Sequence, residues 1–400
     1  MNITINTHHI TPDLFPFEVV ERKGLGHPDT LADGLAENAE IAYSNYCINE
    51  FGYIPHHNFD KLMIIGGLCK QVYGGGKYQT PIKLIFMGRG SKNFGNNSIP
   101  LQEIQINSAC SYLKNILPNL DISDKTQIQI QSITSSRSTR NNWFTPKGAE
   151  DLPEYVAGPF ANDTAAMISY YPLTKCENLA LYLERYFYLQ QKPRFHEFGQ
   201  DIKIMVVRKN EEISCTLSVP QITYHTTSEM LYYEREQKLY SDLISYIKRQ
   251  YANENIKLFL NPQTVPTTRR SYLVTSGSCI DFGEEGAVGR GNKTHGIIST
   301  FRPNTMEAPH GKNCVYFAGK ILGYLSDVIA KEIYENTLIP CQVILQANIG
   351  DLLYEPSEII ISTAGKVNEK LINDIISKNF SQGRKITSKI LESCHFMPKI

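Results

Sequence analysis

Short runs rich in Ile, Val and Phe alternate along this chain with longer stretches whose apolar residues recur at helical spacing. The short runs are typical of β-strands and lie at residues 61–68, 81–88, 126–133, 202–208 and 358–365. The longer stretches predict helices at residues 29–50, 177–190, 228–251 and 319–335. Strands mixed with helices in this way predict an α/β or α+β fold.

No linker divides the chain into obvious parts. Its 400 residues suggest two or three subdomains with ample length to bury a large interior. Yet no long Gly/Ser-rich or Pro-rich segment, block of charge or internal repeat is visible. We therefore expect residues 1–400 to form a single unit without an independent domain boundary. Within it, the Asn- and Ser-rich residues 91–98 predict an exposed loop.

Charge balance and cysteine usage restrict the possible partners and the compartment. Lys plus Arg (40) equals Asp plus Glu (40), so no global field favours nucleic acid or an anionic membrane. The nine cysteines are scattered and contain no CxxC pair, which is typical of reduced thiols in a cytosolic protein. The N-terminus lacks a signal-peptide layout, and no apolar run approaches the roughly 20 residues that cross a bilayer. We expect a cytoplasmic protein in which any polyanionic ligand needs a local cluster of cations.

The most informative segment is residues 21–33, ERKGLGHPDTLAD. Pro28 stands where a helix would begin, so His27 and Asp29 bring an imidazole and a carboxylate together at a helix N-terminus. Such an end attracts phosphate through its free N–H groups and the helix dipole. His27 can bond a leaving phosphate oxygen, and Asp29 or Glu21 can hold Mg²⁺ through oxygen. The same pattern fits an ordinary polar helix cap, so these residues alone leave both interpretations open.

Two glycine-rich segments follow. Residues 66–76, GGLCKQVYGGG, favour a hairpin connection over a nucleotide-binding loop, since they lack a Walker A ending. In residues 283–293, GEEGAVGRGNK, paired carboxylates precede Arg290 and Lys293. This order suits a site for metal and phosphate, because Arg forks onto phosphate oxygens and Lys adds a point charge. A solvated charged turn is the alternative. Lys312, before another expected helix, is weak support by itself.

In this order, the segments resemble the archaeal-type S-adenosylmethionine synthetase family. The resemblance covers nearly the whole chain and is carried by VERKGLGHPDTLADGLAE (20–37), KLMIIGGLCKQVYGGG (61–76), ANDTAAMISYYPL (161–173), GQDIKIMVVR (199–208) and GEEGAVGRGNKTHGIISTFRPNTMEAPHGKN (283–313). It implies three pseudo-repeated α/β subdomains, interleaved along the chain, and a homodimer with active sites between the subunits. It also implies the family's reaction, in which methionine sulfur attacks C5′ of ATP and expels tripolyphosphate, which is then hydrolysed to pyrophosphate and phosphate.

The resemblance assigns catalytic roles residue by residue. His27 would bond the departing oxygen and stabilise its charge. Three cations would clamp phosphate oxygens, namely Lys203, Arg290 and Lys312. These roles suit the chemistry, because a thioether needs no general base and the difficulty lies in alignment and in the charge that gathers on the leaving group.

Ligands of metal and substrate are implied in the same way. Asp29 and Glu284 would ligate Mg²⁺, and a monovalent cation, typically K⁺, is expected as well. Asp163 would hold the ammonium group of methionine. The other expected substrate-binding residues are Glu21, Gly289, Asn292 and Lys293.

The chain departs from the family near these expected ligands. Glu284 and Glu285 replace a usual pair of aspartates, the family's Ser-Phe-Gly-Val-Gly reads AAMIS at residues 165–169, and its Asn-Pro-Val-Asn-His reads NCVYF at residues 313–317. Substitutions gathered near ligands indicate a diverged paralogue. The resemblance therefore implies a methionine adenosyltransferase, with two alternatives: a related enzyme that alkylates a different sulfur substrate with ATP, or a non-catalytic nucleotide-binding homologue.

Overall fold

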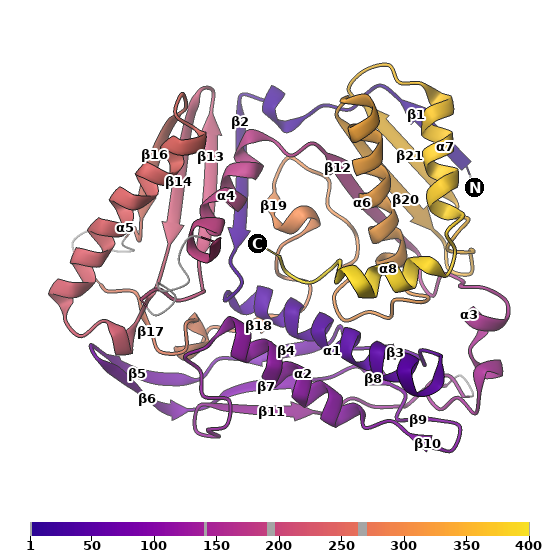
Figure 1. Ribbon diagram of the computed structural model, residues 1–400, viewed down its shortest axis with the longest axis horizontal. Coiled ribbons are helices and arrows are strands. Elements are labelled where there is room, and N and C mark those ends of the chain that lie inside the picture. The colour runs from indigo at the N-terminus through magenta and orange to yellow at the C-terminus, as the bar shows by residue number, and fades with distance from the viewer. Residues whose placement is uncertain (1, 140–141, 190–196, 263–269, 400) are drawn as a thin grey trace.

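Three mixed sheets of four or five strands form the framework of the structure (Figure 1). The computed structural model describes residues 2–139, 142–189, 197–262 and 270–399. Sheet I consists of β18 (Gly286–Ala287), β4 (Leu62–Ile65), β7 (Ile82–Phe86) and β11 (Ile128–Ser132). Sheet II consists of β19 (Ile298–Ser299), β2 (Phe17–Lys23), β13 (Lys203–Lys209), β14 (Glu212–Ser218) and β16 (Asn255–Leu260). Sheet III consists of β12 (Ala165–Tyr171), β20 (Cys341–Ala347), β21 (Glu358–Thr363) and β1 (Asn2–Asn6).

Two long helices accompany each sheet. They are α1 (Pro28–Phe51) and α2 (Leu101–Ile116) on sheet I, α4 (Lys175–Leu189) and α5 (Glu229–Gln250) on sheet II, and α6 (Ala318–Thr337) and α7 (Glu369–Phe380) on sheet III. The shorter helices are α3 (Pro153–Val156) and α8 (Lys385–Ser393). Two-stranded ribbons pair β3 (His57–Asn58) with β8 (Arg89–Gly90), β5 (Leu68–Val72) with β6 (Gly75–Thr80), β9 (Asn93–Phe94) with β10 (Asn97–Ser98), and β15 (Gln221–Ile222) with β17 (Leu273–Val274). Among the residues described, no helix combines the length and the apolar character needed to cross a membrane.

The three sheets repeat one strand topology. In sheet I, β18 is antiparallel to β4, β4 is antiparallel to β7, and β7 is parallel to β11. The strands β2–β13–β14–β16 of sheet II and β12–β20–β21–β1 of sheet III show the same order of two antiparallel pairings and one parallel pairing. In each sheet a long helix precedes the second of these strands. The predicted fold class, three pseudo-repeated units of mixed sheet and helices, is confirmed.

The repeated units are interleaved along the chain. β1 pairs with β21 in sheet III, β2 pairs with β13 in sheet II, and α1 packs on sheet I, so residues 2–51 contribute to all three units. A repeat whose parts come from distant segments leaves no period in the sequence, which is why none is visible there. That the chain lacks an independent domain boundary stays a prediction.

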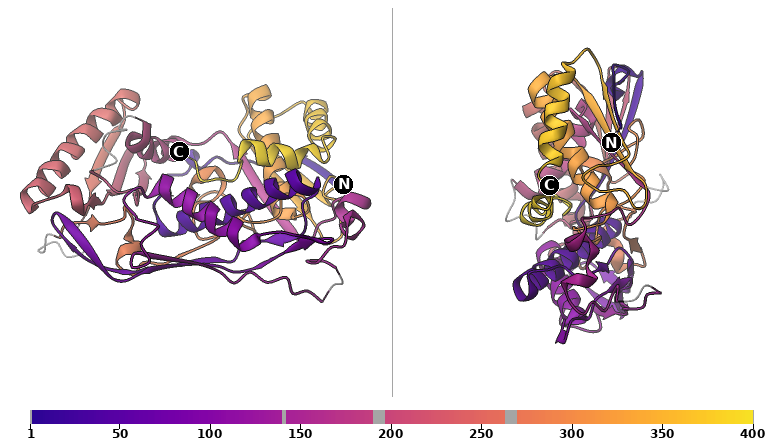
Figure 2. Two further views of the ribbon diagram at one scale, coloured as in Figure 1. Left: turned by 60° about the horizontal axis from the view of Figure 1, so that its bottom comes forward. Right: turned by 90° about the vertical axis from the view of Figure 1, so that its right-hand side faces the viewer.

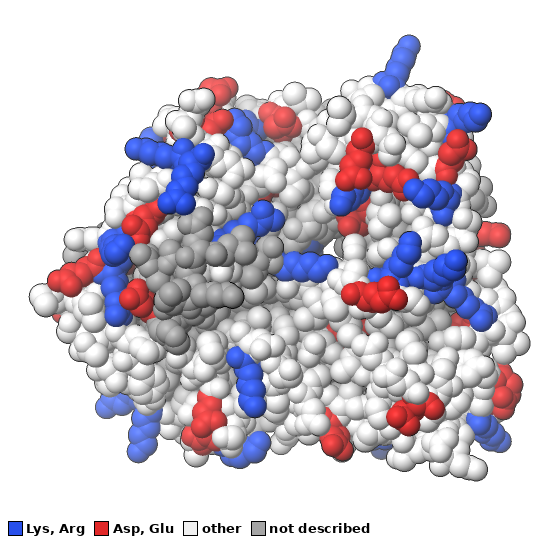
Figure 3. All heavy atoms as spheres, viewed as in Figure 1, with Lys and Arg blue, Asp and Glu red and all other residues white. Residues whose placement is uncertain are grey.

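Helices cover one face of each sheet. Alternate strand residues point toward the helices and build three apolar cores, one per sheet. Figures 1 and 2 show the helices on the same side of the molecule, with the sheets behind them. On the other side, no described helix packs against the sheets, and side chains such as Met63, Val207 and Ile344 are half-exposed. On the helix side, acidic and basic side chains are interspersed (Figure 3).

The expected strands and helices are all present, with somewhat different bounds. The strand expected at residues 61–68 ends at Ile65, and Leu68 begins the β5–β6 hairpin that the glycine spacing favoured. The expected helix 177–190 ends at Leu189, and residue 190 lies outside the described residues. The prediction of an exposed loop at residues 91–98 is wrong in part. These residues include the β9–β10 hairpin, and Ser91 is buried, where its carbonyl accepts a hydrogen bond from the Tyr43 hydroxyl at 2.9 Å.

Candidate active site

His27 caps the N-terminus of α1. Pro28 occupies the first turn, and His27 Nδ1 accepts a hydrogen bond from the Asp29 backbone N–H at 3.2 Å. A neutral imidazole that accepts through one nitrogen carries its proton on the other, so Nε2 of His27 is a donor. Burial, followed by the Lys23 charge, lowers the pKa of His27 to about 4. The ring is therefore neutral near pH 7 and able to donate from the end of a helix.

Asp29 is bonded to cations and to the glycine-rich loop (residues 283–293). One carboxylate oxygen accepts from the Lys23 ammonium at 2.9 Å, and the other accepts from the Ala287 N–H at 3.2 Å. Arg290 Nε lies 3.7 Å from this second oxygen, while 74% of the Arg290 side chain is exposed. Lys23 also donates to the Arg290 carbonyl at 2.7 Å. The two segments that the sequence singled out thus meet at the N-terminus of α1.

Glycines allow this loop to lie against the helix. A Cβ atom on Gly286 would be 2.2 Å from the Pro28 carbonyl oxygen. A Cβ atom on Gly291 would be 2.1 Å from the Asp33 carboxylate. The contact at Gly286 is with backbone, so the close approach of loop and helix requires glycine there, whereas a side chain at position 291 would displace the Asp33 carboxylate.

Strands β2 and β13 add further charged residues at the same place. Their register pairs Lys203 with Lys23. The Lys203 ammonium lies 3.4 Å from the Glu21 carboxylate. Lys203 also helps to lower the pKa of His27, after burial and Lys23. We call this group of residues the α1 cluster: Glu21, Lys23, His27, Asp29, Lys203 and Arg290.

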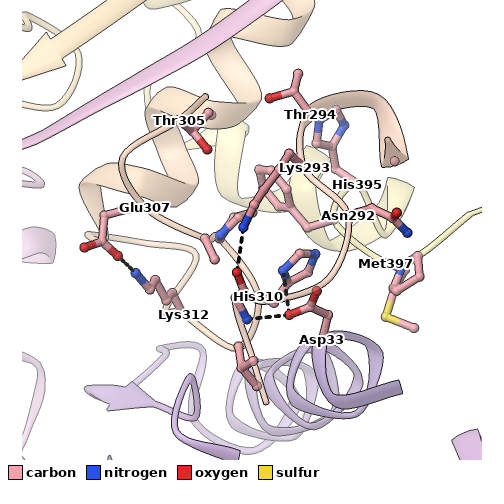
Figure 4. Close-up of a pocket in the computed structure, with 18 of the residues that line it drawn as sticks. Asp33, Asn292, Lys293, Thr294, Thr305, Glu307, His310, Lys312, His395 and Met397 are labelled. Carbon is pink, nitrogen blue, oxygen red and sulfur yellow. Dashed lines mark hydrogen bonds and ion pairs between the residues drawn. The ribbon is translucent and has the colours of Figure 1, made fainter. Parts of the chain in front are cut away.

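A cavity of about 650 Å³ lies beside the α1 cluster. Its walls come from α1, the glycine-rich loop, residues 305–312 and residues 395–399 (Figure 4). Asn292 connects this central cavity to the α1 cluster, because its side chain makes two hydrogen bonds with the backbone of Lys23. Four of the predicted site residues line the cavity, namely Gly289, Asn292, Lys293 and Lys312.

Local partners hold the two lysines of the central cavity. Lys293 Nζ donates to the Gly289 carbonyl at 2.6 Å. Lys312 Nζ forms an ion pair with Glu307 (Figure 4). The Lys312 ammonium also lies 4.3 Å from the centre of the Phe317 ring. One of the aromatic residues that depart from the family pattern therefore supports a predicted phosphate-binding lysine through a cation–π contact.

Two predicted residues lie apart from these groups. Asp163 is exposed in the turn before β12, where its carboxylate accepts the Thr164 N–H at 2.8 Å, and it does not line the central cavity. Glu284 is exposed, and it contributes, after burial, to raising the pKa of Asp201 to about 6. Among the described residues, no three His, Cys, Asp or Glu side chains converge to hold a metal ion.

Sequence reasoning missed three residues of the site. Lys23 and Asp33 lie within the segment 21–33, and the spacing of Asp29 and Asp33 already places both carboxylates on one helix face. Asp33 accepts the Gly289 N–H at 2.7 Å and so fixes the glycine-rich loop. No sequence pattern pointed to His310, because it lies far from Asp33 in the sequence and contacts it only in the folded protein.

The chain is similar in sequence to known proteins. Residues 1–394 match the sequence profile described as S-adenosylmethionine synthetase (AdoMet synthetase). An S-adenosylmethionine synthase of Methanobrevibacter smithii is 30% identical over 389 residues, which cover 94% of each chain. A probable S-adenosylmethionine synthase of Aquifex aeolicus is 31% identical over 371 residues, covering 90% of this chain and 89% of the relative. An uncharacterised protein of Streptococcus pyogenes serotype M3 is 50% identical over 409 aligned positions, covering 100% of this chain and 98% of the relative.

The similarity extends to three dimensions. A solved structure described as an unusual S-adenosylmethionine synthetase from Campylobacter jejuni aligns with a TM-score of 0.62 over 93% of this chain and 88% of that chain. The two sequences are 17% identical, so this alignment shows a shared fold and nothing about activity. The arrangement of three sheets with helices is therefore common to both proteins.

Proposed function

Because the chain belongs to the S-adenosylmethionine synthetase family, we propose that it is a methionine adenosyltransferase, which forms S-adenosylmethionine from ATP and L-methionine with release of phosphate and pyrophosphate. The observation that carries the proposal is the α1 cluster, in which a neutral His27 with a donating Nε2 lies near the cations Lys23 and Lys203 at a helix N-terminus. A donor and several cations at such an end suit a polyphosphate leaving group.

The proposed reaction makes specific demands on these residues. The bond between C5′ of ATP and its bridging oxygen breaks as the methionine sulfur bonds to that carbon. The electron pair of the broken bond passes to the oxygen, so negative charge on the tripolyphosphate grows in the transition state. His27 Nε2–H would donate to this oxygen, and Lys203, Arg290 and Lys312 would hold other phosphate oxygens. These residues act by alignment and charge stabilisation, since the sulfur attacks without deprotonation.

Mg²⁺ and K⁺ belong to the proposal as cofactors. Mg²⁺ commonly binds through one or two carboxylates, with its other ligands supplied by phosphate oxygens and water. Asp29 fits this donor set, because its carboxylate lies among the proposed phosphate-binding cations. Glu284 is proposed as the second carboxylate. The metal would neutralise charge along the phosphate chain.

The residues proposed to bind methionine suggest a second candidate function. We assign Asp163 and Glu21 to the methionine end, and Gly289, Asn292 and Lys293 to further substrate contacts. Met167 and Ile168 lie in the segment that departs from the family pattern, and both line the central cavity. Met167 stands where the family pattern has a glycine, so its side chain occupies space that glycine would leave open. This favours, as the second candidate, an enzyme that alkylates a different sulfur compound with ATP.

We propose further that the protein is a cytoplasmic homodimer whose two active sites draw on both subunits. The sheet face that lies opposite the helices supports a subunit contact, since Ile65 and Phe259 on it are 37% and 50% exposed. Exposed apolar side chains gathered on one face favour an interface. Glu21 and Lys203 of the α1 cluster point to the same face, because Val20 and Ile204 beside them point to the helices.

Mass spectrometry of products tests the proposed reaction. The purified protein is incubated with ATP, methionine, Mg²⁺ and K⁺, and S-adenosylmethionine, phosphate and pyrophosphate are measured together. Equal amounts of the three products are expected. A folded, ATP-binding protein that uses a different thioether would support the second candidate. A folded, ATP-binding protein that forms no product from any thioether would support the interpretation as a non-catalytic, nucleotide-binding homologue.

The substitution His27→Ala tests the role of His27. His27→Ala should keep much of its affinity for ATP and lose about 10²–10³-fold in kcat, as expected when one donor to a developing oxyanion is removed. His8→Ala is the matched control, because His8 is exposed near the N-terminus and lies outside the site. Turnover at the wild-type rate in His27→Ala would remove the role assigned to this residue.

A further inference from the structure

Three carboxylates lie in a row on one face of α1. Asp33, Glu37 and Glu40 follow one another at helical spacing, and their side chains are 2%, 0% and 0% exposed. Buried carboxylates are costly unless they have partners. Lys320 of α6 lies between Glu37 and Glu40, at 2.7 Å and 3.0 Å. The remaining carboxylate, Asp33, borders the central cavity and meets a different cation.

That partner is His310, in the loop between Glu307 and Lys312. Its Nδ1 lies 3.3 Å from Asp33 Oδ1, and 13% of its side chain is exposed. Nδ1 is buried and makes no hydrogen bond with a described residue, so its contact with Asp33 is an ion pair. The other ring nitrogen is turned away from Asp33 toward the cavity (Figure 4). Asp33 also accepts the Gly289 N–H at 2.7 Å, so its carboxylate is fixed from two sides. The imidazole therefore faces the Asp33 carboxylate through one nitrogen and is available to a ligand at the other.

The charged groups that face His310 come from both adjoining helices. Burial is the largest single effect and acts to lower the pKa of His310, as does the charge of Lys320 on α6. The carboxylates of Asp33 and Glu37 on α1 raise the pKa, and together they outweigh both. The pKa is raised above its ordinary value of 6.5. The imidazolium is thereby favoured at a place where Lys293 and Lys312 also line the wall of the cavity.

We infer that His310 is a phosphate-binding residue of the central cavity: its Nε2–H donates to an oxygen of the polyphosphate chain, and Asp33 is the positioning residue that fixes its orientation. The inference rests on the proposed function for the identity of the ligand, ATP and the tripolyphosphate made from it. A volume of about 650 Å³ is within the range of small-molecule sites, which is about 300–1,000 Å³. The three donors, His310, Lys293 and Lys312, present N–H groups and no acceptors when the imidazole is protonated, which selects an anion rich in oxygen.

Calorimetric titration with inorganic tripolyphosphate tests the inference without requiring turnover. Wild-type protein is expected to bind more weakly as the pH rises through the raised pKa of His310. His310→Ala should weaken binding about tenfold at pH 6.5, as for loss of one charge-assisted hydrogen bond. His310→Gln places a neutral amide N–H near the position of Nε2 and should restore part of the affinity without the pH dependence. His8→Ala, at an exposed histidine, is the control.

Asp33→Asn separates the positioning role from a merely structural one. The amide oxygen can still accept the Gly289 N–H, but the negative charge facing His310 is gone. Affinity for tripolyphosphate should then match that of the wild type near pH 5 and fall below it at pH 7.5. Thermal unfolding of each variant shows whether the fold is retained.

The outcomes distinguish this inference from the proposed function. Equal affinity for tripolyphosphate in wild type and His310→Ala, with normal formation of S-adenosylmethionine, overturns the inference alone. Binding that depends on His310, without formation of S-adenosylmethionine, supports the inference and overturns the proposed function. A wild-type protein that neither binds tripolyphosphate nor forms product overturns both.

Discussion

His27 is partly buried and Asp201 is fully buried, and burial moves their pKa values in opposite directions. It lowers the pKa of His27 to about 4 and raises that of Asp201 to about 6. The cause is the same in both, because burial disfavours whichever form is charged. For His27 the result is a neutral donor at the end of α1. For Asp201 it is a carboxylate whose ionisation weakens the folded state.

Asp201→Asn should therefore stabilise the protein at neutral pH. The pKa of Asp201 is raised in the folded state, so its contribution to stability is present below about pH 3.8 and is lost as the pH rises through about 6. Asn retains the acceptor for the Cys279 N–H, which Asp201 binds at 2.9 Å. The variant should be more stable than wild type by up to about 3 kcal/mol at pH 8. Near pH 4 the two should be nearly equal.

Urea unfolding at pH 4 and pH 8 measures both differences. Asp121→Asn is the control for an exposed aspartate whose pKa is lowered rather than raised. A variant at Asp201 that is less stable than wild type at pH 8 would contradict the expected sign.

At the scale of elements, α1 shows why a helix at a functional site is hard to interpret from its sequence. The apolar stripe of Leu31, Leu35 and Ala39 predicts one buried face, and these residues are indeed in the core of sheet I. The charged residues Glu37 and Glu40 are equally buried, although charge on a helix usually indicates solvent. Burial raises the pKa of Glu37. For Glu40, burial acts in the same direction, but Lys320 and His57 together outweigh it and lower the pKa to about 2.

Lys320→Met should destabilise the protein by about 3–5 kcal/mol, since it leaves buried carboxylates without their cation. The ammonium of Lys320 contacts both Glu37 and Glu40. Lys331→Met, on the same helix, is the control: its side chain is 56% exposed and pairs with Glu335 across one helical turn. That surface pair is worth about 0.5 kcal/mol or less. Chemical denaturation compares the two variants, and equal losses of stability would contradict a special role for the buried lysine.

Local patterns predicted the elements and much of the site, and tertiary contacts supplied the rest. Alternation of Ile and Val runs with helical stripes is enough to predict the mixed fold, and the sequence His27–Pro28–Asp29 predicts the start of α1. The link between Asp33 and His310 joins residues 277 positions apart in the chain (310 minus 33), which no local pattern can reveal. The same holds for Asn292 on the backbone of Lys23.

At the scale of the whole molecule, the three units place their helices on one side and their open sheets on the other (Figure 2). The open side carries half-exposed apolar side chains together with Glu21 and Lys203 of the α1 cluster. An arrangement that exposes part of the proposed active site on an apolar face suits the binding of a second copy of the chain.

Ile65→Glu should disrupt the proposed dimer. Ile65 ends β4 on the open face of sheet I and is 37% exposed, so a charge there opposes an apolar contact. Ile48→Glu is the matched control, because Ile48 is 39% exposed on the outer surface of α1. Sedimentation should show a smaller species for the first variant and wild-type behaviour for the second. Product formation is expected to fall with the dimer. An Ile65→Glu protein that sediments like wild type would speak against this face as the interface.

The interleaving of the three units has a consequence for synthesis on the ribosome. β1 (Asn2–Asn6) is translated long before its partner β21, which begins at residue 358. At about 5–20 residues per second, the first strand waits roughly 20–70 s for its neighbour. Sheets I and II have all their strands once residue 299 has been translated, whereas sheet III closes only after β21 has been made. Strand β1 stays unpaired throughout this interval, so it is the strand that chaperones which shield exposed strand edges can contact for the longest time.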